Sequence, residues 1–267
     1  MVKAILFDLA DTLLQFDHLD HRALFLLGAK DTYRHLHGLG APLPEFEVYT
    51  RIHFRAFRRK YIWSNIRRRD FNVNDVICQV LHKLNISLPQ DEIPALVWRW
   101  YKPVVRRATV EAGTHAMLRE FQRQGLKLAI VSNTCAPDYC LDRHLEREKL
   151  LEFFPIRIYS SNTIYRKPHP VIFRVALEQL GISAEQAVFV GDTLGADIQG
   201  ARRAGMITVW KPALRTQTTR KRRVRPDYEI EKIIELADIV PGACPSNGRD
   251  CDGAEMSRMR GGGSSRL

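Results

Sequence analysis

Short apolar runs and longer amphipathic segments alternate along most of the chain. The apolar runs lack the alternation of half-buried strands and have the length of fully buried ones; they span residues 3–8, 127–131, 156–159, 188–190 and 206–210. Apolar residues at helical spacing mark the neighbouring segments, at about 114–124, 138–149, 170–180, 195–204 and 229–238. Strands that alternate with helices predict an α/β fold with an open, Rossmann-like parallel sheet flanked by helices.

The stretch from residue 16 to residue 107 has a different pattern. Apolar residues recur there at helical spacing, and no strand pattern interrupts them; one example is the set Val73, Val76, Ile77, Val80 and Leu81. We therefore expect an all-helical cap at residues 16–107, inserted into an α/β core of residues 1–15 and 108–240. Residues 241–267 are rich in glycine and nearly free of apolar side chains, which predicts a disordered tail.

The chain is basic, with 41 Lys and Arg against 30 Asp and Glu among its 267 residues. The net charge of +11 favours anionic partners, and we expect a small phosphorylated substrate, with nucleic acid as a less favoured ligand. Much of this charge lies in the predicted cap, at Arg51, Arg55, Arg58, Arg59, Lys60, Arg67, Arg68 and Arg69. A second basic run spans residues 220–225. For both runs, recruitment of an anionic ligand and a solvated charged surface remain open interpretations.

The same patterns bear on the cellular setting. Charged residues interrupt every apolar stretch well short of the roughly 18 residues that a membrane-spanning helix needs. Asp8 and Asp11 interrupt the apolar run that a secretory signal requires. The 5 cysteines show no paired spacing, which favours free thiols in a reducing compartment. We expect a cytoplasmic protein with no membrane partner, and the patterns leave its oligomeric state open.

Polar residues follow the predicted strands at the point where each strand ends, and others open the helices that come next. They offer carboxylates, hydroxyl and amide groups and one cation: Asp8, Ser132, Asn133, Lys167, Asp192 and Asp197. Each of them alone would fit an ordinary turn or a helix cap. The C-terminal ends of parallel strands meet at one edge of a sheet, and ligands bind in the crevice there. Together these residues therefore predict a ligand site at that edge.

Four segments resemble the motifs of the haloacid dehalogenase superfamily of phosphohydrolases, over roughly residues 3–240. Asp8-Leu9-Ala10-Asp11-Thr12 resembles the first motif, normally Asp-x-Asp-x-Thr, and Val131-Ser132-Asn133 resembles the second. Lys167, within Arg-Lys-Pro-His-Pro, resembles the third motif. Gly191-Asp192-Thr193 through Asp197 resembles the fourth, and this match is the strongest. The resemblance implies a phosphatase with a helical cap inserted after the first motif.

The resemblance also implies a role for each motif residue. Asp8 would attack phosphorus and form an aspartyl-phosphate. Asp8, the backbone carbonyl of Ala10 and Asp192 would hold Mg²⁺, with Asp197 in support. Lys167 would take part in catalysis by binding phosphoryl charge and by lowering the pKa of its carboxylate neighbours. The substrate oxygens would be bound by Thr12, Ser132, Asn133 and Lys167.

The chain departs from the family pattern at Ala10. The family normally places there an Asp that protonates the leaving oxygen and then activates the hydrolytic water. Such a group contributes about 10²–10⁴ in rate. Asp11 does not replace it, because a side chain one residue further on leaves the backbone in another direction. We therefore expect a Mg²⁺-dependent phosphohydrolase of small phosphate monoesters that is impaired by Ala10, whether this residue is natural or engineered.

Two alternatives remain open. Ala is usual at this position in the phosphonoacetaldehyde-hydrolase-like branch, where a cap lysine forms a Schiff base; Lys60 would be the candidate, although that branch usually has Gly where this chain has Asp11. The other alternative is a non-catalytic protein that binds phosphorylated ligands or nucleic acid through its basic cap. The halide-releasing branch fits least, because it does not need the metal site that Gly191 and Asp192 imply.

Overall fold

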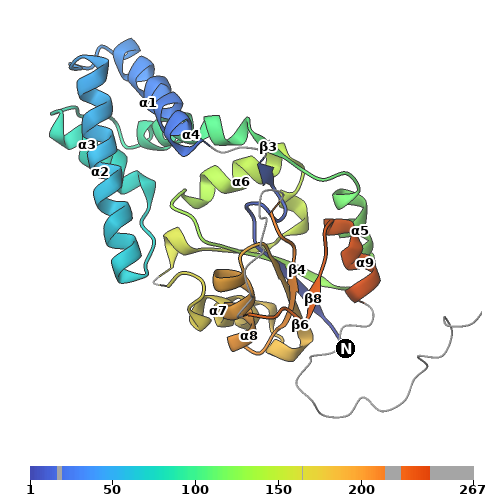
Figure 1. Cartoon of the computed structure of the whole chain (residues 1–267). Coiled ribbons are helices and arrows are strands. Elements are labelled where there is room, and N and C mark those ends of the chain that lie inside the picture. Colours follow the sequence, from blue (N-terminus) through green and yellow to red (C-terminus); the bar gives the residue numbers. More distant parts are fainter. Residues whose placement is uncertain (17–19, 164, 214–223, 241–267) are drawn as a thin grey trace, which may run out of the picture.

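Six parallel strands form the central sheet of this structure, a computed structural model that describes residues 1–16, 20–163, 165–213 and 224–240 (Figure 1). In their order across the sheet these strands are β5 (Ile156–Tyr159), β4 (Lys127–Ser132), β1 (Ala4–Phe7), β6 (Ala187–Gly191), β7 (Ile207–Trp210) and β8 (Tyr228–Glu229). Every neighbouring pair runs parallel. The predicted fold class, an open Rossmann-like sheet, is therefore confirmed.

Helices cover both faces of the sheet, which explains why its strands are apolar without alternation. In β1, Ile5 and Phe7 belong to the core shared with α5 (Thr114–Arg123) and α6 (Asp138–Arg147). The intervening residues of β1 belong to the core on the opposite face, beneath α7 (Pro170–Leu180) and α8 (Gln199–Arg203). Successive side chains of a strand point to opposite faces. Each residue of these strands therefore needs to be apolar.

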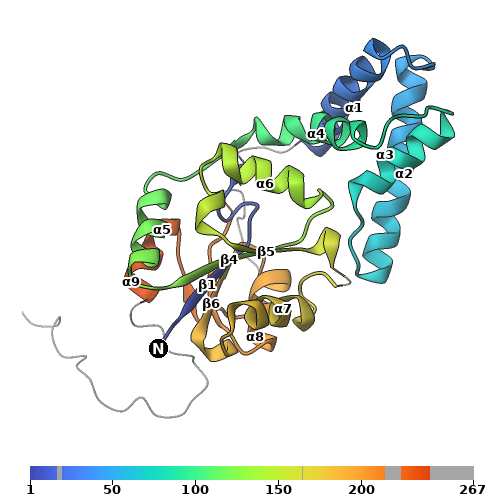
Figure 2. The same cartoon turned by 180° about the vertical axis from the view of Figure 1, so that it is seen from behind.

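Four helices form a separate layer beside the sheet, here called the helical unit: α1 (His21–Gly38), α2 (Phe46–Arg67), α3 (Val73–Lys83) and α4 (Glu92–Val105). A short antiparallel pair, β2 (Gln15–Phe16) and β3 (Ala108–Thr109), brings the two ends of this unit together. In both views the N-terminus lies on the side of the sheet away from the unit, so β1 runs toward it (Figures 1 and 2). The helical unit therefore stands beside the C-terminal ends of the strands.

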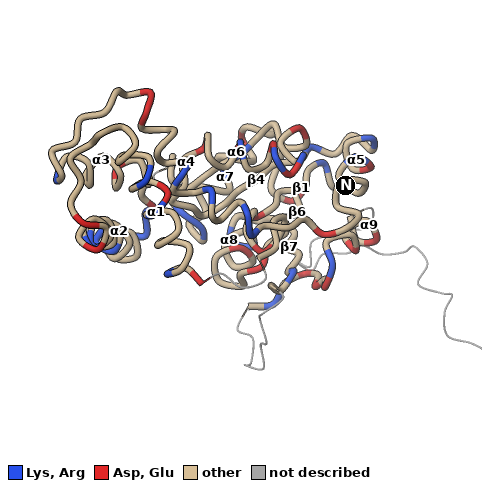
Figure 3. The backbone as a smooth tube through the Cα atoms, turned by 90° about the horizontal axis from the view of Figure 1, so that it is seen from above, with Lys and Arg blue, Asp and Glu red and all other residues tan. Residues whose placement is uncertain are grey.

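Charge is concentrated on α2. This helix carries six basic residues and one acid: Arg51, Arg55, Arg58, Arg59, Lys60 and Arg67, against Glu47 (Figure 3). Within the described residues, no helix is long and apolar enough to cross a membrane. The division of the chain into core, cap and tail stays a prediction. The predicted tail at 241–267 and most of the basic run at 220–225 lie outside the described residues.

The expectation of one helix at residues 229–238 is confirmed only from residue 233 onward. The segment begins as β8, continues as a short 3-10 turn (Ile233–Glu235) and ends in α9 (Leu236–Ile239). Here the Ile230 amide donates to the carbonyl of Trp210 in β7. The apolar spacing was compatible with a helix, but an unpaired edge of β7 offers hydrogen bonds that a helix cannot supply. The segment at 195–204 also differs, because its first turn, Leu194–Ile198, is a π-helix.

The contact between α1 and α4 gives a stability prediction. A Cβ atom at Gly28 would lie 2.5 Å from the backbone oxygen of Trp100, a distance at which the two helices must separate. We expect Gly28→Ala to lower the free energy of unfolding by about 1–3 kcal/mol. Gly38→Ala, at the end of the same helix and with nothing within 4 Å, is the control and should be neutral or slightly stabilising. Urea denaturation measures both, and equal effects would contradict the close packing.

Candidate active site

Three carboxylates meet at the C-terminal edge of the sheet. Asp8 follows β1 and Asp192 follows β6, and these strands are neighbours in which Phe7 lies opposite Val190. Asp197 reaches the same place from the π-helical turn after β6. One carboxylate oxygen from each of the three aspartates lies within 4.8 Å of the others. The structure thus brings together the three acids that the sequence placed at one edge.

Lys167 supplies a positive charge inside this cluster. Its Nζ lies 2.5 Å from Oδ1 of Asp8 and 2.7 Å from Oδ1 of Asp197, and the side chain is 2% exposed. Burial acts against a charged amine, but the carboxylates of Asp197 and Asp8 together outweigh it and raise the pKa of Lys167 above its ordinary value. Lys167 is therefore a fixed cation, held by two of the three acids.

The acids themselves are less well compensated. Burial is the main cause that raises the pKa of Asp8 to about 6, and Asp197 adds to the rise while Lys167 opposes it. Burial also raises the pKa of Asp192 to about 8, with further contributions from the charges of Asp8, Asp197 and Asp11. One ammonium group does not balance this many carboxylates at close range. The cluster is thus an electrostatic environment that favours an additional cation.

The backbone of Lys167 is held by Asn133, which follows β4. The Asn133 amide group donates to the carbonyl of Lys167 at 3.0 Å, and its oxygen accepts from the Lys167 backbone N–H at 2.8 Å. We expected Asn133 among the substrate-binding residues, but its side chain is engaged on both sides with the main chain of Lys167. Its evident effect is to fix the segment that carries the ammonium group, and its contact with a substrate stays a prediction.

Asp197 is positioned by its own turn. Its Oδ2 accepts a hydrogen bond from the Thr193 backbone N–H at 2.9 Å. A Cβ atom at Gly191 would lie 2.5 Å from the Cβ of Asp197, so the close approach requires glycine. The glycine of the Gly191-Asp192-Thr193 segment therefore has a packing reason: it admits the buried carboxylate that pairs with Lys167.

Two hydroxyl groups lie at the same strand ends. Ser132 ends β4 and is buried, and Thr12 lies in the turn that follows β1 with its side chain 1% exposed. Within the described residues, the buried Oγ1 of Thr12 has no hydrogen-bond partner. A buried hydroxyl that lacks a partner carries a desolvation penalty, which an oxygen-bearing ligand would relieve. This observation favours an anionic oxygen ligand beside Thr12.

Ala10 is exposed, whereas Asp11 is buried. Asp11 has a φ of 59°, in the left-handed region, and its N–H donates to the carbonyl of Leu14 at 2.7 Å. This turn sends the two neighbouring side chains in different directions. Asp11 nevertheless lies near enough to raise the pKa of Asp192. The sequence analysis did not place Asp11 beside the acidic cluster. The signal that could have done so is its position inside the first motif.

The structure does not bring Lys60 into the cluster. Its Nζ pairs instead with Oδ2 of Asp75 at 3.3 Å, within the helical unit.

The sequence analysis did not identify Asp70, which pairs with Arg166 at 3.0 Å across the boundary between the helical unit and the sheet. No local pattern marks such a pair, because its two residues lie in distant parts of the chain.

The raised pKa values predict how the stability of the metal-free protein depends on pH. Between pH 6.5 and 8 the folded state binds more protons than the unfolded one, because burial raises the pKa of Asp192 from 3.8 to about 8. Below pH 6.5 the proton that Asp8 retains adds to this excess, but burial lowers the pKa of His53 and of His144 from 6.5 to about 4 and offsets it. The free energy of unfolding should therefore fall as the pH rises from about 6.5 to 8, by at most about 1.4 kcal/mol per pH unit for each excess proton.

Denaturation at several pH values in the presence of EDTA measures this dependence. Asp192→Asn should flatten the decline above about pH 6.5, where Asp192 is the main contributor. Asp75→Asn, which removes a carboxylate from the helical unit, should keep it. A parent protein that becomes more stable from about pH 6.5 to pH 8 would contradict the raised pKa of Asp192.

Comparison with known proteins identifies relatives that match this chain over most of its length. Over 244 residues the chain is 29% identical to the glyceraldehyde 3-phosphate phosphatase of Methanopyrus kandleri, covering 90% of this chain and 97% of that protein. The Pyrococcus abyssi enzyme of the same name is 27% identical, over 92% and 97%. A crystal structure of a HAD phosphatase from Thermococcus onnurineus matches with a TM-score of 0.57 and 25% identity, over 91% of this chain and 100% of that one.

The family model for haloacid dehalogenase-like hydrolases matches residues 2–205. This range includes the strand ends that carry Asp8, Lys167, Asp192 and Asp197, together with the helical unit between β2 and β3. The chain belongs to the haloacid dehalogenase-like hydrolase family.

Proposed function

We propose that the protein is a Mg²⁺-dependent phosphohydrolase that transfers the phosphoryl group of a small phosphate monoester to Asp8. The observation that carries this proposal is the buried cluster in which Asp8 and Asp197 flank Lys167 while Asp192 lies beside them. Such a site can bind a dianionic phosphoryl group and present a carboxylate oxygen to it. Phosphatases of small metabolites among the relatives support the same chemistry.

In the first half of the reaction, an oxygen of Asp8 forms a bond to phosphorus while the bond to the ester oxygen breaks. Lys167 binds developing negative charge on the phosphoryl oxygens. The hydroxyl groups of Thr12 and Ser132 orient those oxygens, and the unpartnered hydroxyl of Thr12 supports this assignment. Splitting hydrolysis into attack by Asp8 and later attack by water replaces one difficult step by two easier ones.

The residues at the strand ends fit a hard divalent cation. Carboxylate and carbonyl oxygens are the ligands that Mg²⁺ takes in proteins, and Asp8, Asp192 and the backbone carbonyl of Ala10 would supply them. The pKa values of Asp8 and Asp192, raised chiefly by burial and further by neighbouring acids, support the same assignment, because a cation would stabilise their charged forms. When bound, the cation would neutralise charge between Asp8 and the phosphoryl oxygens. Asp197, already paired with Lys167, would support the site without binding the cation itself.

Ala10 impairs the two halves of this reaction unequally. A good leaving group needs little protonation, so Asp8 can still be phosphorylated by an activated ester or an acyl phosphate. Cleavage of the aspartyl-phosphate needs an activated water whatever the substrate was, and position 10 offers no base. We therefore propose slow turnover with a phosphorylated Asp8 as the species that accumulates.

We further propose that the helical unit is the cap that selects the substrate. It lies beside the C-terminal ends of the strands, and α2 carries a strong positive charge (Figures 1 and 3). A basic surface beside a phosphate site raises the local concentration of anionic substrates. Several relatives are named for small phosphorylated metabolites, among them glyceraldehyde 3-phosphate and phosphoserine, which favours a substrate of that class here.

The alternative that Ala10 favours is a non-catalytic protein that binds phosphorylated ligands. It keeps Lys167 and the acids but forms no covalent intermediate. Cleavage of a phosphonate through Lys60 has less support, because Lys60 is paired with Asp75 in the helical unit. Covalent phosphate on Asp8 separates the phosphatase from both alternatives.

Metal binding gives the next prediction. Millimolar Mg²⁺ should raise the thermal unfolding temperature of the EDTA-treated protein, because a ligand that binds only the folded state stabilises it by mass action. Asp192→Asn should abolish this rise, and Asp75→Asn should retain it. A melting temperature that ignores Mg²⁺ in the parent protein would contradict the proposed metal site.

The last prediction of this section concerns Ala10. Incubation with acetyl phosphate and Mg²⁺ should add one phosphate to the intact mass of the parent protein, and Asp8→Asn should remain unmodified. Ala10→Asp should raise steady-state turnover of nitrophenyl phosphate by about 10²-fold or more. Ala10→Asn, of nearly the same shape but unable to transfer a proton, should gain little. If Ala10→Asp gains no more than Ala10→Asn, then the absent carboxylate is not what limits the protein.

A further inference from the structure

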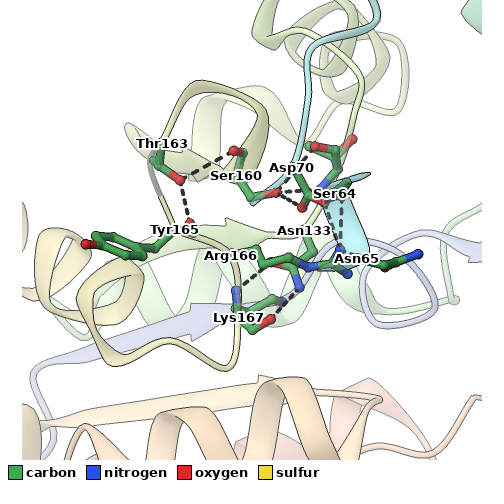
Figure 4. A network of polar contacts seen from close by, with 10 residues as sticks. Ser64, Asn65, Asp70, Asn133, Ser160, Thr163, Tyr165, Arg166 and Lys167 are labelled. Carbon is green, nitrogen blue, oxygen red and sulfur yellow. Dashed lines mark hydrogen bonds and ion pairs between the residues drawn. The ribbon is translucent and has the colours of Figure 1, made fainter. Parts of the chain in front are cut away.

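A polar network joins the helical unit to the loops that carry the site residues (Figure 4). It lies where the link between α2 and α3 approaches the sheet, away from the β2–β3 pair that connects the two parts covalently. At its edge the Val73 backbone N–H donates to the carbonyl of Cys135 at 2.8 Å. The helical unit is therefore tied to the core at its tip as well as at its base.

Asp70 is the centre of this network. Its Oδ1 pairs with Nη1 of Arg166 at 3.0 Å and accepts from the Ser64 hydroxyl at 3.1 Å. Its Oδ2 accepts from the Ser160 hydroxyl at 2.5 Å. The Asp70 side chain is only 10% exposed. A carboxylate so well shielded from water depends on these partners, because loss of one leaves a buried charge uncompensated.

The network reaches the site by two routes. On the first, Arg166 directly precedes Lys167, whose ammonium group pairs with Asp8 and Asp197. On the second, the Ser160 hydroxyl that binds Asp70 also accepts the Thr134 backbone N–H at 2.8 Å. Thr134 follows Asn133, which holds both backbone groups of Lys167. Both routes therefore end on the segment that presents the ammonium group to the carboxylates.

We propose that Asp70 and Arg166 are positioning residues that couple docking of the helical unit to the placement of Lys167. This inference rests on the proposed phosphoryl transfer at Asp8. While the pair is formed, the docked unit holds Arg166, and through it the backbone of Lys167. When the pair is broken, Arg166 is released from the helical unit, and the first route from the unit to the backbone of Lys167 is lost. The pair acts through Lys167 and does not touch the reacting atoms.

This coupling has a distinctive kinetic consequence. In the proposed reaction Lys167 both binds the phosphoryl oxygens and stabilises their charge, so acetyl phosphate binds and reacts best in molecules that have Lys167 in place. The apparent affinity and the rate both fall with the fraction of molecules in that arrangement. Breaking the pair should therefore lower kcat/KM for acetyl phosphate.

The kinetic arm of the test uses acetyl phosphate with Mg²⁺. We expect Asp70→Asn and Arg166→Gln each to lower kcat/KM by about 10-fold or more. Arg166→Lys, which keeps the charge, should recover at least part of the loss. The double variant should be no worse than either single one, because both substitutions break the same interaction. Asp75→Asn, which breaks the Lys60–Asp75 pair inside the helical unit, is the matched control and should behave like the parent.

A second arm does not depend on activity. Amide hydrogen exchange in the absence of substrate should become faster in Asp70→Asn both at residues 64–72 and at the core segments 132–134 and 165–168. Asp75→Asn should leave the core segments unchanged. If Asp70→Asn does not fold, Arg166→Gln breaks the pair from the core side and carries the same expectation. Faster exchange confined to the helical unit would overturn the coupling.

The two arms separate this inference from the proposed function. If the parent protein shows neither turnover nor phosphorylation, the proposed function fails, and the exchange experiment still decides whether the network controls the Lys167 segment. If the parent turns over and Asp70→Asn retains its kcat/KM, the inference fails while the proposed function stands. Equal effects of Asp70→Asn and Asp75→Asn in both arms would also overturn it, because any lost ion pair of the unit would then suffice.

Discussion

The buried ammonium group of Lys167, paired with Asp8 and Asp197, is the interaction on which the arrangement of the site depends. Three carboxylates at the ends of a closely packed sheet repel one another, and burial strengthens that repulsion. Lys167 offsets part of it and so allows Asp8 and Asp197 to remain buried. Asp192, further from this cation, carries the largest remaining cost, which is visible in its raised pKa. The proposed divalent cation would offset this residual imbalance.

The rest of the core serves to hold these groups at fixed positions. Parallel pairing of β1 with β6 places Asp8 beside Asp192, while Gly191 leaves the space that Asp197 fills. Asn133 fixes the backbone of Lys167 from a third strand end. The helical unit adds a further constraint from outside the sheet, through Asp70. A site built from several separate chain segments is rigid only if each of them is held, and here each has an identifiable partner.

Ala10 is an exception within an otherwise complete set of groups. For the proposed reaction, the residues that would bind charge and present a nucleophile are in place, whereas the group that would transfer protons is absent. The structure does not fill the gap from nearby, because Asp11 is buried on the other side of the turn while Ala10 faces solvent. In that reaction, binding, attack and release would depend on different residues and would be separable by substitution.

Much of the architecture follows from local pattern. Apolar runs such as 127–131 have one reading that fits their length and flanking turns, and β4 (Lys127–Ser132) and β5 (Ile156–Tyr159) appear where the pattern placed them. The presence of Asp8, Lys167 and Asp192 at a common edge also follows, because parallel strands put their C-terminal ends together. The pattern placed the start of the last helix too early, because residues 228–229 pair with a neighbouring strand edge as β8 and helical structure begins only at Ile233.

The order of strand ends and motifs along the chain was enough to name the candidate groups of the site, since both are local properties of the chain. How those groups affect one another depends on the fold. Ion pairing of Lys167 with Asp197, engagement of Asn133 with the Lys167 backbone and the contact of Asp70 with Arg166 join residues that are 30 to 96 positions apart. Charge interactions and hydrogen bonds depend on distance and burial in space, and no spacing along the chain encodes either.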